Sequence, residues 1–274
     1  MLFSLMASLV APLSVRAESV DQGIATPWQL GFQAPATPVM EQLVWLHDHF
    51  LLYIIVAISL FVLGVMLVIA LRFNRKANPV ASKNTHNTKL EIIWTVIPIL
   101  ILVAIAIPSL RAHYFIEDES KADMTLKVLG HQWYWSYEYP DHGISYESNI
   151  KQDNELAAGD HRLLSVDNNV VVPVDTKVHV LLTAADVIHA WAVPAFGVKR
   201  DAVPGRLNES WFKATKIGRY YGQCSELCGI KHGFMPIVVD VVSKEDFAAW
   251  IKEKQKKAGI SPQPQQAAAV TDKQ

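Results

Sequence analysis

Two long stretches without a charged residue most constrain how this chain of 274 residues can fold. The first, Phe50–Leu71, has 22 residues, and the second, Ile92–Leu110, has 19 and contains Pro98 and Pro108. A helix of about 20 apolar residues crosses the hydrocarbon layer of a bilayer, and membrane helices tolerate proline better than soluble helices do. The pattern therefore favours a transmembrane hairpin over residues 47–112 rather than two buried helices of a soluble core.

Basic side chains are concentrated in the loop between the two apolar stretches. Because positive charge favours the cytoplasmic side of a membrane, we expect this loop to lie inside. Residues 18–46 and everything after Arg111 then lie outside, so the N-terminal segment and the C-terminal half share one side. The basic residues of the loop are Arg72, Arg75, Lys76, Lys83 and Lys89.

The two ends of the chain have their own composition. Leu2–Leu13 is apolar but too short to span a bilayer, and the small residues Val15 and Ala17 suit a signal peptidase, so residues 1–17 are predicted to be a signal peptide. Its positive n-region is missing, which makes the signal atypical or places the true start upstream. Residues 18–46 are predicted to be an external segment, and residues 244–274 a helix followed by a disordered tail rich in Pro, Gln and Ala.

The residue pattern of 118–243 is typical of a β-domain. Short runs with alternating or β-branched residues are separated by turn residues, and no long amphipathic helix interrupts them. The whole chain is therefore predicted to be an α+β membrane protein, with a transmembrane hairpin followed by an external β-sandwich or barrel. The predicted strands are Met124–Leu129, Val170–Val174, Val178–Leu182 and Ile237–Val242.

The only two cysteines, Cys224 and Cys228, lie four residues apart and are followed by His232 and Met235. Thiolate, imidazole and thioether ligands together select copper, and His189 is the candidate for a further imidazole from a distant loop. A disulfide is the alternative in an oxidising compartment, and zinc is another, although zinc seldom takes a methionine. A single blue copper ion needs one cysteine, so two cysteines favour two bridged copper ions and a role in electron transfer.

Long ordered motifs make the chain resemble the cytochrome c oxidase subunit II family, the copper A subunit of the haem–copper oxidases, over residues 45 to 250 approximately. The motifs are Gly130–Tyr139, Asp186–Trp191, Asp201–Arg206 and Cys224–Met235. The resemblance implies a cupredoxin-like β-barrel that carries a dinuclear copper A centre. The ligands that it implies are His189, Cys224, Cys228, His232, Met235 and the backbone carbonyl of Glu226.

The resemblance also implies roles that spacing alone does not give. The Glu226 side chain would bind a magnesium ion shared with subunit I. Trp133 would be the point of electron entry, although the residues alone favour a packed strand or an interfacial belt. Glu91 would lie at the mouth of a proton channel, or act only as a helix N-terminal carboxylate. The implied docking carboxylates are Glu138, Asp167 and Asp186.

By this resemblance the chain is an oxidoreductase subunit that accepts electrons from reduced cytochrome c and passes them to the haem groups of subunit I. Oxygen is reduced to water there, with coupled proton pumping. The implied partners are subunits I and III, cytochrome c and the lipid bilayer, with no nucleic acid. The implied location is a bacterial inner membrane, which the chain crosses more than once, with the N-terminus and the copper domain in the periplasm.

Three other functions share part of this pattern. A nitrous oxide reductase has a similar copper loop but not this hairpin, and a copper chaperone would not need Met235 or a second histidine. A quinol oxidase subunit has the fold without the copper ligands.

Between Asp118 and Asp240, 16 acidic residues against 12 basic ones give a net charge of −4, which is the sign that a lysine-rich cytochrome c would need.

Overall fold

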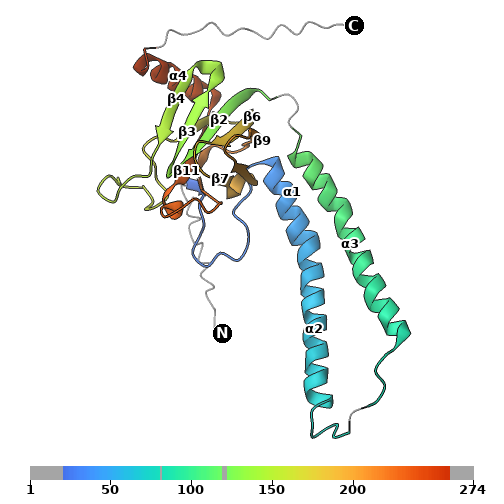
Figure 1. Ribbon diagram of the computed structural model, residues 1–274. Coiled ribbons are helices and arrows are strands. Elements are labelled where there is room, and N and C mark those ends of the chain that lie inside the picture. Colours follow the sequence, from blue (N-terminus) through green and yellow to red (C-terminus); the bar gives the residue numbers. More distant parts are fainter. Residues whose placement is uncertain (1–20, 81, 119–121, 260–274) are drawn as a thin grey trace, which may run out of the picture.

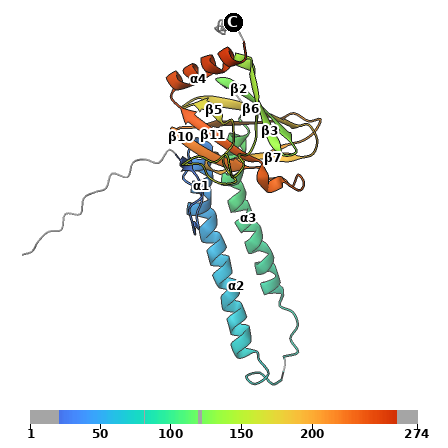
Figure 2. The same ribbon diagram turned by 90° about the vertical axis from the view of Figure 1, so that its left-hand side faces the viewer.

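The computed structural model describes residues 21–80, 82–118 and 122–259. The signal peptide predicted for residues 1–17 and the tail predicted beyond residue 259 lie outside these ranges. Within them, a helical hairpin projects from one side of a β-domain, and the two parts are clearly separate in both views (Figures 1 and 2).

The hairpin consists of α1 (Pro38–Leu46), a π-helical turn (His47–Leu51), α2 (Leu52–Arg72) and α3 (Thr88–Ile116). Helix, turn and helix run without a break from Pro38 to Arg72, and both this unit and α3 are long and apolar enough to cross a membrane. The central residues of α2 and α3 are exposed within this chain, so their apolar surface is left for lipid or for other subunits.

Both helical units begin before their apolar stretches, at Pro38 and Thr88, where a side chain caps each helix. The Thr37 hydroxyl accepts a hydrogen bond from the Met40 amide, and Pro38 occupies the first helical position. The Asn87 side chain accepts one from the Leu90 amide at the start of α3. The predicted hairpin is therefore confirmed as a pair of helices, and these helices extend beyond residues 47–112 at both ends.

Two mixed sheets and one hairpin make up the β-domain. The first sheet has the order β1-β10-β11-β5, the second has the order β4-β3-β2-β6-β9, and β7 pairs only with β8. The strands are β1 (Asp21–Gly23), β2 (Met124–His131), β3 (Tyr134–Tyr139), β4 (Ile144–Ser148), β5 (Val170–Pro173), β6 (Lys177–Ala184), β7 (His189–Val193), β8 (Val198–Ala202), β9 (Asn208–Lys213), β10 (Gly218–Gln223) and β11 (Pro236–Val242).

The sheets enclose one apolar core, and the alternation seen in the sequence explains how. Every second residue of β2 and β6 is buried, as a strand with one face on a core requires. The β-branched runs of β5 and β11 are buried on both faces. The cupredoxin-like β-domain is thus confirmed, with one correction. The described strands form separate sheets and do not close into a barrel.

Helix α4 (Lys244–Lys257) packs on the end of the domain away from the hairpin, as both views show (Figures 1 and 2). It begins at residue 244, where the helix of residues 244–274 was expected to begin, and the Ser243 hydroxyl accepts the Asp246 amide hydrogen bond as an N-cap. Phe247 and Ile251 are buried against the core.

Contacts at both ends of the hairpin fix it to the β-domain. The Ala36 amide donates to the Ala195 carbonyl, and the Thr37 hydroxyl donates to the Phe196 carbonyl at 2.7 Å. After α3, the Arg200 guanidinium forms a bidentate pair with the Glu117 carboxylate, and the Phe115 ring packs edge-on against Trp211. The orientation of the β-domain over the membrane helices is therefore set by both ends of the hairpin.

Candidate metal centre

The cysteine loop lies at one end of the β-domain, between β10 and β11. Gln223 and Pro236 pair across the base of this loop, so its ends are held by the sheet. The Ser225 amide donates to the Ala190 carbonyl of β7, which brings His189, the first residue of β7, beside the loop. A side chain at Gly222 would collide with the Ala192 carbonyl, so this glycine allows β10 and β7 to approach closely.

Five donor atoms, three sulfurs and two imidazole nitrogens, lie close together at the cysteine loop. The two cysteine sulfurs are 3.8 Å apart, and both thiols are free and buried, so they do not form a disulfide. Each sulfur has its own imidazole. Nδ1 of His189 lies 3.9 Å from Cys224 Sγ, and Nδ1 of His232 lies 3.5 Å from Cys228 Sγ.

Two weaker donors complete the arrangement, one at each sulfur. The Met235 thioether sulfur lies 3.5 Å from Cys228 Sγ, and the Glu226 carbonyl oxygen lies 3.3 Å from Cys224 Sγ. This donor set is soft and nearly symmetric, with one imidazole and one weak ligand beside each of two sulfurs. It fits two bridged copper ions better than one tetrahedral zinc ion.

The charges of the two thiols are coupled. Burial raises the pKa of Cys224, but hydrogen bonding to His189 and to backbone groups outweighs burial and holds that pKa below its ordinary value. Burial raises the pKa of Cys228, and the negative charge of Cys224 raises it further. The protein by itself therefore stabilises one thiolate but not two. A metal ion held by Cys224 and Cys228 would supply the positive charge that a second thiolate needs.

Asp186 fixes the orientation of His189, a role that the sequence analysis missed. The His189 ring is fully buried, and its Nε2 lies 2.9 Å from Asp186 Oδ1, which leaves Nδ1 facing Cys224. The other carboxylate oxygen accepts the Gln132 amide hydrogen bond at 2.7 Å. Gly130 makes room for the ring, because a Cβ there would lie 2.9 Å from it. An acidic residue three positions before a candidate ligand was the only sequence signal for this role.

Trp133 lies against the cysteine loop. Its indole N–H donates to the Cys228 carbonyl at 3.2 Å, and the Gln132 side-chain amide donates to the same oxygen at 2.8 Å. The ring is partly exposed. Gly229 has a φ of +118°, and a side chain there would press on this ring. The aromatic residue predicted for electron entry is therefore in direct contact with the backbone of a predicted ligand.

The predicted carboxylates lie in different settings. Glu226 is exposed at the loop, and Glu138 on β3 pairs with Lys127, both about half exposed. Asp167 accepts the Asn149 amide hydrogen bond. Asp186 is one-third exposed and engaged with His189. Glu91 lies in the first turn of α3, where its carboxylate accepts a hydrogen bond from the Asn87 amide. It therefore caps the N-terminus of this helix.

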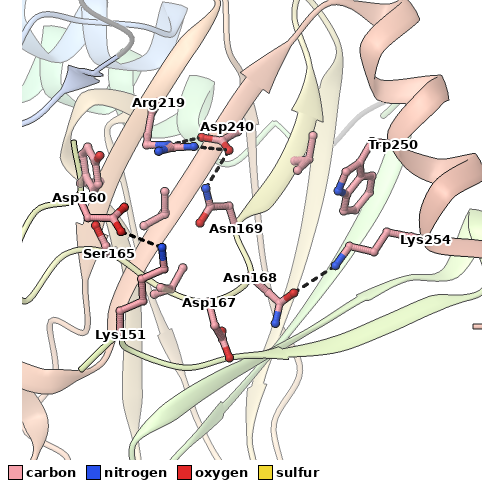
Figure 3. A pocket seen from close by; sticks show the side chains of 14 residues that line it. Lys151, Asp160, Ser165, Asp167, Asn168, Asn169, Arg219, Asp240, Trp250 and Lys254 are labelled. Carbon is pink, nitrogen blue, oxygen red and sulfur yellow. Dashed lines mark hydrogen bonds and ion pairs between the residues drawn. The ribbon is translucent and has the colours of Figure 1, made fainter. Parts of the chain in front are cut away.

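A polar pocket of about 310 Å³, distinct from the candidate metal centre, is lined by residues of β5, β10, β11 and α4 and of the loop before β5 (Figure 3). Its charged groups pair with one another: Lys151 with Asp160 at 2.8 Å, and Arg219 with Asp240 at 2.6 Å. The Lys254 ammonium donates to the Asn168 side chain. These pairs tie the loop before β5 to the sheet and helix around it, so the pocket is explained as a structural network rather than a ligand site.

Two membrane-capable helices and an external domain with a buried Cys–Cys–His cluster define the class: a membrane-anchored, cupredoxin-like metal protein. Residues 124–242 match the family described as cytochrome c oxidase subunit II, periplasmic domain, and residues 25–112 match the transmembrane domain of the same subunit. The chain belongs to the cytochrome c oxidase subunit II family.

Curated relatives are similar to this chain over most of its length. A probable cytochrome c oxidase subunit 2 of Rickettsia bellii is 56% identical over 85% of this chain and 86% of its own length. The cytochrome c oxidase subunit 2 of Cyanidium caldarium is 46% identical over 84% of this chain and 92% of its own length. The solved periplasmic domain of subunit II from Bradyrhizobium japonicum is 56% identical, covers 50% of this chain and 96% of its own, and gives a TM-score of 0.47.

Proposed function

We propose that this chain is the electron-entry subunit of a cytochrome c oxidase and holds a dinuclear copper A centre in the cysteine loop. The observation that carries the proposal is the pairing of each cysteine sulfur with its own imidazole nitrogen and its own weak donor. The proposed copper ligands are His189, Cys224, Cys228, His232, Met235 and the Glu226 carbonyl.

A dinuclear copper centre held by these residues would supply one-electron acceptance and release. The chain's own residues would keep the geometry constant through that change. His189, Cys224, Cys228 and Met235 are buried, which excludes water from the ligands. The Asp186 carboxylate holds the His189 ring, and the sheet holds both ends of the loop. A site whose ligands do not move needs little reorganisation, which favours rapid electron transfer over substrate turnover.

Trp133 is the proposed entry point for electrons from cytochrome c. Its partly exposed ring offers a surface that a partner can approach, and its N–H bond to the Cys228 carbonyl gives a short path into the ligand loop. Glu138, Asp167 and Asp186 are the proposed docking carboxylates, and of these Asp186 would combine docking with support of His189.

The exposed tip of the cysteine loop is the proposed contact with subunit I. Leu227 and Ile230 are 78% and 87% exposed there, next to the exposed Glu226. Apolar residues that water would otherwise surround suit a subunit contact. A magnesium ion held by the Glu226 side chain would sit at that contact, and Glu91 at the other end of the hairpin would admit protons to subunit I. Subunit III is proposed as a further partner.

The proposed location is a bacterial inner membrane, with residues 47–112 as the spanning hairpin and residues 18–46 and 118–243 in the periplasm. The basic loop between the helices supports this orientation. Residues 1–17 would be the signal peptide, and residues 244–274 the C-terminal helix and tail.

Electron paramagnetic resonance of the copper-loaded full-length chain tests the proposal. We expect hyperfine splitting from two equivalent copper nuclei that share one unpaired electron. Cys228→Ser should abolish the sharing and leave a single-copper signal, because one bridging sulfur is gone. Ser225→Ala is the matched control in the same loop, since its exposed hydroxyl bonds only the Gln223 carbonyl, and it should leave the spectrum unchanged. A single-copper spectrum from the unmodified chain would contradict the proposal.

A further inference from the structure

The segment that leads from β1 to α1 is uncharged and exposes large apolar side chains, which is unusual for a surface loop. From Ile24 to Met40, 17 consecutive residues carry no charge. Three large apolar side chains on this segment are exposed: Trp28 is 97% exposed, Leu30 is fully exposed, and Phe32 is half exposed. Nothing in the metal centre accounts for them.

The backbone of this segment displays Trp28 at a conformational cost. Thr26 to Gln29 form a tight turn closed by the Gln29 amide and the Thr26 carbonyl at 3.2 Å, with Pro27 in the second position. Trp28 occupies the third position with a φ of +62°, where a turn of this kind normally has glycine. A bulky residue in this unfavourable conformation, at the tip of a turn, indicates that the exposed indole has a use.

The polar groups of the turn bond to one another. The Gln29 side-chain oxygen accepts hydrogen bonds from the Thr26 amide at 3.0 Å and from the Thr26 hydroxyl at 3.3 Å. The Gln29 side-chain nitrogen donates to the Phe32 carbonyl at 2.7 Å. Polar groups that are satisfied internally, with apolar side chains outside them, suit a medium that is poor in water.

The depth of the segment is fixed by a contact with the hairpin. The Phe32 ring packs edge-on against the His47 ring, with centroids 4.9 Å apart. His47 lies three residues before the uncharged stretch that begins at Phe50. The loop accordingly descends from the β-domain to the level at which α1 passes into α2 (Figure 1). Trp45 and Tyr53, also exposed, lie in the same helical unit on either side of that level.

We propose that residues 24–32 form an interfacial anchor that inserts Trp28 and Leu30 into the headgroup boundary of the outer leaflet. Indole rings concentrate at this boundary because the ring is apolar and its N–H can reach headgroup oxygens. The occupant is lipid because the segment lies at the end of the spanning stretch and presents apolar tips without any charged partner group. The anchor gives the β-domain a third attachment to the membrane, beside the two ends of the hairpin, and does not depend on the metal.

Photo-crosslinking in the assembled oxidase, kept in its native membrane, tests this directly. Benzoylphenylalanine is placed at position 28 or 30, with Ala249 on α4 as the matched exposed site at the far end of the β-domain. We expect phospholipid adducts from positions 28 and 30, detected by intact mass, and none from position 249. A crosslink to another subunit would overturn the proposal in favour of a protein contact, and absence of any adduct would mean that the loop lies in water.

Trp28→Gly provides a second measurement, which does not depend on incorporation of the probe. Glycine fits the turn better than tryptophan does, so this variant should fold at least as well as the unmodified chain. In vesicles of brominated phosphatidylcholine, the fluorescence that Trp28 contributes, taken as the difference between the two proteins, should be strongly quenched. An unquenched difference would overturn the proposal.

Discussion

At the scale of single residues, Asp186 carries the sharpest prediction, because two roles are assigned to it. If its carboxylate orients His189, then Asp186→Asn should weaken copper binding by roughly 10–100-fold and alter the copper spectrum, as loss of such partners typically does. Asparagine keeps the shape, and its single oxygen can still accept the Gln132 amide, but its NH2 group then faces the imidazole. The change therefore removes both the negative charge and the acceptor that hold His189 Nε2. The measurements are copper affinity by competition and the absorption spectrum of the loaded chain.

Glu138→Gln is the matched control for that experiment. Glu138 is an exposed carboxylate that contacts Lys127 and none of the proposed ligands. Its removal should slow association with cytochrome c without changing the copper spectrum. If Asp186→Asn behaves in the same way, Asp186 acts only in docking and the assigned support of His189 is wrong.

The sequence predicted the proposed ligands but not what supports them. Cys224, Cys228, His232 and Met235 are close in sequence, so a single loop brings them together, and His189 was placed with them by its motif. Gln132 and Trp133 are both bonded to the Cys228 carbonyl, nearly a hundred residues away. Such a contact depends on how β2, β3 and the loop pack, and periodicity in the sequence does not encode it.

At the scale of the elements, Thr37 joins the first membrane helix to the β-domain. Its hydroxyl accepts the Met40 amide as the N-cap of α1 and donates to the buried Phe196 carbonyl. Thr37→Val should therefore lower the free energy of unfolding by about 2 kcal/mol, from the lost cap and the unsatisfied carbonyl together. Denaturant unfolding of the full chain in detergent measures this, and Thr37→Ser, which keeps the hydroxyl, should recover most of the loss.

The same helix shows why the sequence analysis predicted a helix that was too short at its N-terminal end. Apolar stretches placed the spanning segments well, because hydropathy reports the core of a bilayer. Residues 38–49 also carry Glu41, Asp48 and two histidines, so hydropathy alone did not extend the helix back to Pro38. The four predicted strands correspond to β2, β5, β6 and β11, whose alternating or β-branched runs are easy to recognise, whereas a buried strand such as β7 was not predicted. Sheet closure depends on edge pairing, and the expected closed barrel is not seen among the described strands.

At the scale of the whole molecule, basic and acidic residues are concentrated in different parts of the chain. The loop between α2 and α3 is basic, whereas the external domain has a net charge of −4 between Asp118 and Asp240. The basic loop orients the chain in the membrane, and the acidic domain faces the compartment from which a cationic electron donor would arrive. Basic charge in the loop and acidic charge in the β-domain therefore lie in separate parts of the chain.

That separation predicts a salt-dependent reaction with cytochrome c. Raising the ionic strength from about 0.01 M to about 0.1 M shortens the screening length from about 30 Å to about 10 Å. The association rate of the assembled oxidase with reduced cytochrome c should then fall by about tenfold or more, since electrostatic steering accelerates encounter by at least that factor. Glu138→Gln should lower the rate at low salt and flatten the salt response. Glu245→Gln on α4, at the far end of the domain, should change neither. Stopped-flow kinetics measures all three proteins, and a rate for the unmodified oxidase that does not change with salt would remove the acidic surface from the docking mechanism.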